Sequence, residues 1–156
     1  MLNMPAAAKI MLSETELAKL TDPEWILTKQ VITDKVVQLF NRQVPVITEL
    51  FGTVLQECPF PELLSAKARI SKGENYLGLP LVMLDYPAVF SKEDVFAVRT
   101  MFWWGKFLSI TLQLAGKYKT LLAHNAAETI RQNAADGLFL CIHEDQWHHH
   151  FEQDNY

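Results

Sequence analysis

One stretch decides the fold class of this chain: Phe107-Leu108-Ser109-Ile110-Thr111-Leu112-Gln113-Leu114-Ala115. Apolar and polar residues alternate along it, so the leucines and the isoleucine point to one side of an extended chain. Ser109, Thr111 and Gln113 then point to the other side. This period of two predicts a half-buried β-strand, and therefore a sheet.

Helical patterns lie on both sides of this strand. Upstream, Ser91-Lys92-Glu93-Asp94 is typical of a helix cap, and the residues after it predict a helix that ends at Trp104. Gly105 would take the C-terminal capping position. Downstream, Gly116 is expected to turn the chain into a helix over about residues 117–135.

Three more strands are predicted. Residues 66–71 alternate in the same way as the first stretch, residues 72–75 have turn composition, and residues 76–84 are almost wholly apolar. Together they predict a β-hairpin. A final strand is expected over residues 138–143.

The first third of the chain carries helix signals. Ser13-Glu14-Thr15-Glu16 is a capping box that opens a short helix to about Leu20, and Asp22-Pro23-Glu24 is a second helix start. Because Pro45 cannot donate a helical hydrogen bond, a kink or break is expected between residues 41 and 44.

These elements predict one α+β domain over residues 13–156, preceded by a disordered stretch of residues 1–12. N-terminal helices would be followed by a mostly antiparallel sheet of about four strands, covered by helices. The expected order is helices, hairpin, helix, strand, helix, strand.

Length and composition fit one globular domain. The chain has 156 residues, of which 49% are hydrophobic and 21% charged, close to the globular average. Residues 1–142 hold all 14 basic and 14 of the 18 acidic side chains, and this neutral body has no basic stripe for nucleic acid. No export signal or membrane-spanning apolar run is evident, so Cys58 and Cys141 are expected to be reduced thiols of a cytoplasmic protein.

The last fourteen residues, 143–156, have the most distinctive chemistry. They contain four of the five histidines and four carboxylates, but no Lys or Arg, which accounts for the net charge of −4. Imidazole and carboxylate groups together suit a divalent transition metal. A solvated chain end and a pH-responsive contact are the alternatives. The candidate ligands are His143, Asp145, His148, His149 and Glu152.

The segment from Val95 to Trp104 is rich in aromatic residues. On a helix, its apolar side chains would occupy two faces, as in a helix that is central to a core or shared with a partner. Since Trp and Arg are frequent anchors of interfaces, Arg99, Phe102, Trp103 and Trp104 are candidates for a homodimer contact. Burial within one subunit is the simpler interpretation, and the homodimer contact is its main competitor.

A ligand site is a further hypothesis. Asp85 follows the predicted second strand and is placed to pair with Arg99 or to orient a ligand. A mostly apolar small-molecule pocket between the sheet and the helices is a separate hypothesis for ligand binding. Its candidate lining residues are Tyr76, Tyr86, Phe102 and Trp103.

Common catalytic signatures do not occur in the sequence, which has no phosphate-binding glycine loop, nucleophile elbow or zinc-protease motif. No catalytic residue and no cofactor beyond a divalent transition metal are therefore assigned. The sequence favours a small non-catalytic protein-interaction domain that forms a homodimer, with neither nucleic acid nor membrane as partner. The alternative is a metal- or small-ligand-binding protein, in one version an enzyme, that uses the C-terminal segment.

Overall fold

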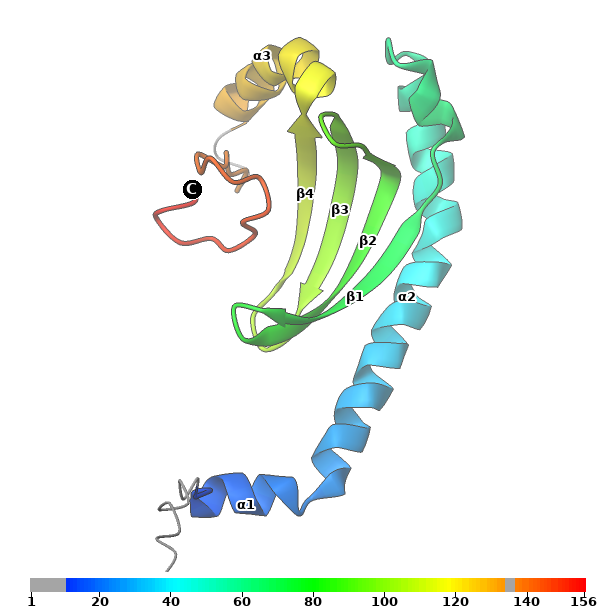
Figure 1. Ribbon diagram of the computed structural model, residues 1–156. Helices are drawn as coiled ribbons and strands as arrows, with labels where there is room; N and C mark the ends of the chain where they lie inside the picture. The colour runs from blue at the N-terminus through cyan, green and yellow to red at the C-terminus, as the bar shows by residue number, and fades with distance from the viewer. Residues whose placement is uncertain (1–10, 134–136) are drawn as a thin grey trace, which may run out of the picture.

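A computed structural model describes residues 11–133 and 137–156 (Figure 1). It contains a four-stranded antiparallel sheet in the order β1-β2-β3-β4, with helices before and after it. The predicted α+β class and four-stranded antiparallel sheet are confirmed. The elements are α1 (Glu14–Leu20), α2 (Pro23–Gln56), the 3-10 helix η1 (Pro61–Ser65), β1 (Arg69–Tyr76), β2 (Leu79–Phe90), β3 (Val95–Trp103), β4 (Leu108–Ala115) and α3 (Gly116–Gln132).

Most of the N-terminal stretch expected to be disordered, residues 1–10, lies outside the described residues, as do residues 134–136. The helix starts that follow are confirmed. The Ser13 Oγ accepts a hydrogen bond from the Glu16 N–H at 3.2 Å, while the Glu16 carboxylate accepts from the Ser13 N–H at 2.7 Å. The Asp22 carboxylate caps α2 by accepting from the Glu24 N–H at 3.0 Å.

Of the kink or break expected before Pro45, the break is absent, because α2 runs without interruption from Pro23 to Gln56. Proline removes one backbone hydrogen bond from a helix. On both sides of it, however, α2 packs against the sheet through Phe40, Val44 and Ile47. Tertiary packing of an apolar face, which supplies most helix stability in proteins, therefore outweighs the lost bond.

The predicted hairpin is confirmed, although its turn is displaced. β1 and β2 pair from Arg69↔Asp85 to Tyr76↔Leu79, so residues 72–75 lie in β1 and the turn is at Leu77-Gly78. Gly78 has φ +83°, a conformation in which glycine meets no Cβ penalty. β2 then continues to Phe90, beyond the predicted end.

The helix predicted over residues 91–104 is wrong, since residues 95–103 form β3. The cap signal is real but serves a turn: the Ser91 Oγ accepts from the Asp94 N–H at 2.9 Å, and the Ser91 N–H donates to the Asp94 carbonyl. After it come valine, threonine and aromatic residues, which favour strands. β3 pairs with β2 on one side and β4 on the other.

β4 and the helix after it are confirmed, whereas the strand predicted over residues 138–143 is wrong. The C-terminal segment, residues 137–156, has no regular structure. Instead of pairing with a sheet edge, the segment packs through aromatic rings: the ring of Phe139 lies 5.3 Å from that of Phe151, which lies 5.0 Å from that of Phe107.

The core lies on both faces of the sheet. On the helix face, α2 packs over Val82 and Leu84 through Phe40. On the opposite face, which we call the tail face, Leu81, Met101 and Trp103 form another cluster. The remaining cluster joins α2, η1, β3 and α3 through Leu55, Phe60, Leu63, Phe96 and Tyr118. None of the helices in the described part of the chain is long and apolar enough to cross a membrane.

Candidate functional site

A buried ion pair stands at the centre of the tail face. Asp85 of β2 and Arg99 of β3 are directly opposite in the strand register. The Arg99 Nε and Nη2 donate to the two Asp85 carboxylate oxygens at 2.7 and 3.1 Å. Asp85 is 1% and Arg99 5% exposed. The predicted pairing is thus present, held by two neighbouring strands instead of a strand and a helix.

The C-terminal segment covers this pair. Arg99 Nη1 lies 3.0 Å from His149 Nε2, and the guanidinium carbon lies 5.8 Å from the ring of Phe90 and 5.6 Å from that of Trp147. The Tyr76 hydroxyl accepts from the His149 backbone N–H at 2.7 Å. The segment is therefore anchored by the same arginine that pairs with Asp85.

His149 is held in its neutral form at this contact. Burial, and next to it the positive charge of Arg99, lower the pKa of His149 from its ordinary 6.5 to about 4. Because arginine offers only donors, Nε2 of the neutral ring must accept the Arg99 hydrogen bond. The proton of His149 then resides on Nδ1.

Not every buried polar atom between the C-terminal segment and the sheet has a hydrogen-bond partner. Five buried side-chain atoms in the described residues have no hydrogen-bond partner, and each belongs to the C-terminal segment or to the tail face beneath it. Such atoms cost about 1–3 kcal/mol each, so this contact is less well satisfied than the strand pairing. They are Trp103 Nε1, Gln113 Oε1, Gln146 Oε1, His148 Nδ1 and His150 Nδ1.

The candidate metal ligands are distributed along the C-terminal segment. The rings of His143 and His148 stack with centroids 3.8 Å apart, and His148 Nε2 lies 3.7 Å from Asp145 Oδ2. His149 faces Arg99, while Glu152 lies beside a shallow depression. Among residues 11–133 and 137–156, no group of three or more His, Cys, Asp or Glu side chains is arranged to hold a metal ion.

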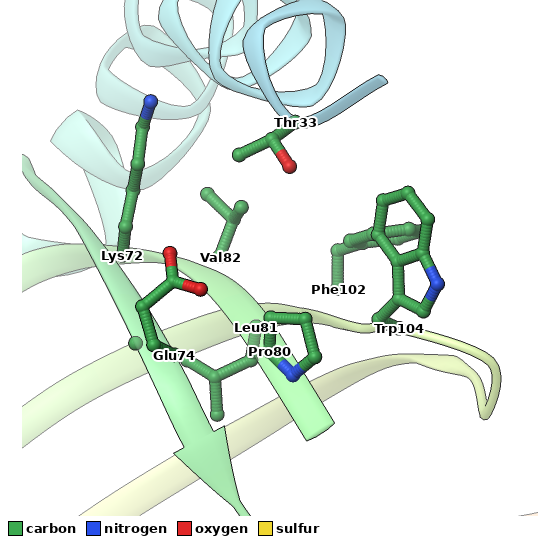
Figure 2. Close-up of a pocket in the computed structure, with 9 residues that line it drawn as sticks. Thr33, Lys72, Glu74, Pro80, Leu81, Val82, Phe102 and Trp104 are labelled. Atoms are coloured by element: carbon green, nitrogen blue, oxygen red, sulfur yellow. The ribbon is translucent and has the colours of Figure 1, made fainter. Parts of the chain in front are cut away.

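The candidate pocket residues lie on opposite faces of the sheet. The rings of Tyr76 and Trp103 are 5.0 Å apart on the tail face, whereas Tyr86 contacts Phe51 of α2 on the helix face. Phe102 and Trp104 border a narrow cleft between α2 and the β1–β2 hairpin (Figure 2). Its volume of about 10 Å³ is the space of roughly one water molecule.

The helix face is covered over only half its width. α2 contacts β1 and β2, whereas the apolar residues of β4 on the same face remain open to solvent. Leu108 is 61% exposed, Ile110 73% and Leu112 50%. A sheet face with such a row of apolar side chains is normally covered by another element.

A second row of exposed apolar residues runs along α2. Trp25, Ile32, Leu39 and Val46 recur every seven residues and are 37–57% exposed. Asp34 of α2 bonds Lys72 of β1 at 3.1 Å, and helix geometry places this row on the other flank of α2. Where α2 lies over the sheet, this flank, with Leu39 and Val46, therefore faces the β3–β4 half. We call this surface the open trough: its floor is Leu108, Ile110 and Leu112, and its wall is Leu39, Val46 and Leu50.

Sequence reasoning did not find the open trough. The alternation in residues 107–115 was visible, but alternation does not tell which apolar face is covered. One usable signal was the number of helices available to cover the sheet, since a single long helix is too narrow to cover one face of four strands. The spacing of Trp25, Ile32, Leu39 and Val46 was a second one.

Comparisons with protein-family models, with curated proteins and with solved structures find no match for this chain.

Proposed function

We propose that this protein is a non-catalytic protein-interaction domain that acts as a homodimer. The open trough carries the proposal. Contiguous exposed apolar surfaces often mark sites of association. The floor strand adds to this: residues 107–115 contain no charged residue and no proline, the features that usually protect a sheet edge from pairing with another chain.

The test is the mass of the untagged protein in solution, measured by native mass spectrometry and by light scattering over a wide concentration range. A dimer is expected, and Ile110→Lys should shift it to monomer because a charge would enter the apolar floor. Leu77→Asn is the matched control, since Leu77 is also exposed, at 65%, but lies in the β1–β2 turn with φ 49°, where asparagine is tolerated. A wild-type monomer at all concentrations would refute the proposal.

The second candidate function is metal or small-ligand binding by the C-terminal segment. It rests on the proximity of the stacked rings of His143 and His148 and of Asp145 beside them, which in the described residues are not arranged as a three-ligand metal group. Titration of untagged protein with Zn²⁺ and Ni²⁺ tests it. His148→Ala should lower the affinity at least tenfold, as loss of one ligand does; an unchanged affinity would exclude this site.

A cytoplasmic location belongs to the same proposal. Cys58 and Cys141 are both free thiols, in keeping with a reducing compartment. Fractionation of cells that produce the untagged chain would test it, and recovery in a secreted fraction would count against it.

A further inference from the structure

The N-terminal part of the molecule projects away from the sheet. We call residues 11–32 the arm: it comprises α1 and the first turns of α2, which extend beyond the strands (Figure 1). Every residue of the arm is exposed except Asp22 and Lys29, which are half-buried. An ion pair joins the arm to the sheet: Lys29 Nζ lies 2.6 Å from the Glu74 carboxylate of β1.

The composition of the arm does not suit an element surrounded by water. Nine large apolar side chains in it are between 37% and 81% exposed. Trp25, Ile26 and Leu27 are consecutive, so they point to different sides of α2. A helix that is apolar on several sides is normally buried. The nine exposed apolar residues of the arm are Met11, Leu12, Leu17, Leu20, Trp25, Ile26, Leu27, Val31 and Ile32.

The arm and the open trough therefore fit one another chemically. The trough combines an exposed apolar floor with an exposed apolar helix flank, and an amphipathic helix buries its apolar face on surfaces of this kind. The arm cannot reach the trough of its own subunit, because α2 is a continuous helix that carries the arm past the end of the sheet. A second copy of the chain is free of that constraint.

The charges around the two surfaces agree with this pairing. Residues 13–24 carry four carboxylates and one lysine, whereas the floor strand is uncharged and has lysines at both ends. An arm approaching the trough thus meets no like charge in the floor itself. Of the lysines beyond its ends, Lys117 is paired with Glu62, and the Lys106 ammonium lies over the ring of Trp103 on the tail face.

We propose that the arm of each subunit lies in the open trough of a second copy, so that two arms are exchanged across a two-fold axis. This inference rests on the homodimer proposed above and names the surfaces that form it. Exchange of identical segments between two copies closes the assembly at two subunits. It buries arm and floor together.

The test is a mixing experiment with two variants of the full chain. The arm variant is Ile26→Gln with Leu27→Gln, and the trough variant is Ile110→Lys; all three positions are exposed, and glutamine favours helix. Each variant alone should be mostly monomeric, with a dimer dissociation constant at least tenfold higher than that of the wild type. Circular dichroism of each variant verifies that it is folded.

The decisive sample is the equimolar mixture. The intact arm of the trough variant can enter the intact trough of the arm variant, so native mass spectrometry should detect a mixed dimer that neither variant forms with itself. Leu77→Asn, which leaves both the arm and the trough intact, serves as control and should dimerise as the wild type does. If the wild type is dimeric but the mixture gives no mixed dimer, arm exchange is overturned while the homodimer stands. If the wild type is monomeric, the homodimer itself fails.

Discussion

The two faces of the sheet are covered in opposite ways. The tail face carries a buried ion pair and is closed by an irregular segment of the same chain, which contacts Arg99 through His149. The helix face is closed by a regular helix over β1 and β2, and its β4 half is open. The ion pair on the tail face thus lies beneath a cover, whereas Leu108, Ile110 and Leu112 on the helix face lie uncovered. The comparison shows that each face of the sheet is covered only where a segment of the same chain packs on it.

The largest effect is expected from breaking the ion pair on the tail face. Arg99→Met leaves Asp85 as a buried carboxylate without its partner, so the free energy of unfolding should fall by about 3–5 kcal/mol. Urea denaturation measures it. The double variant Asp85→Leu with Arg99→Met should regain most of the loss, because a well-packed apolar pair can replace a buried ion pair. A double variant as unstable as the single one would contradict this account.

A cavity beneath the same face should have the next largest effect. Met101 is 0% exposed and packs with Leu81 and Trp103. Met101→Ala should destabilise the protein by about 2–5 kcal/mol, as measured by denaturant unfolding. A loss below about 1 kcal/mol would show that the C-terminal segment does not close this face in solution.

Lowering the pH should destabilise the folded protein through protonation of His149 on the tail face. The unfolded chain takes up a proton at this residue near its ordinary pKa of 6.5, whereas the folded chain does so only near pH 4. The free energy of unfolding should therefore fall as the pH decreases from 6.5 to 4, by up to about 3 kcal/mol, since each pKa unit corresponds to 1.36 kcal/mol.

His149→Gln keeps an acceptor for Arg99 but does not titrate, so it should flatten that part of the pH profile. Urea denaturation of both proteins at several pH values measures the difference. Identical slopes for the two proteins between pH 6.5 and 4 would exclude His149 as the source.

The smallest effect on folding is expected on the helix face. Ile110 is 73% exposed, so Ile110→Ala should change the stability of the monomer by no more than about 0.5 kcal/mol. The measurement is made at a concentration at which the wild type is dissociated. Because Met101 and Ile110 lie on opposite faces of neighbouring strands, this pair of variants compares the two faces directly. A loss of 2 kcal/mol at Ile110 would mean that the trough is covered within one subunit.

Much of the fold was predictable from local sequence, and much of the site was not. The capping box at Ser13, the start at Pro23 and the strand at residues 107–115 each rest on short-range chemistry. The prediction of a helix over residues 95–103 was wrong because Ser91 and Asp94 make the same hydrogen bond in a turn as at a helix start. Pairing with strands on both sides then decided its conformation.

The sequence by itself determined the α+β class, the helix starts, the alternating strand and the chemistry of the C-terminal segment, because these depend on residues close together in the chain. The tertiary structure alone decided that α2 continues through Pro45 and that His149 of the C-terminal segment covers the Asp85–Arg99 pair. It also decided that the apolar side of β4 remains open. Each of these depends on which distant elements come into contact, and local periodicity carries no information about that.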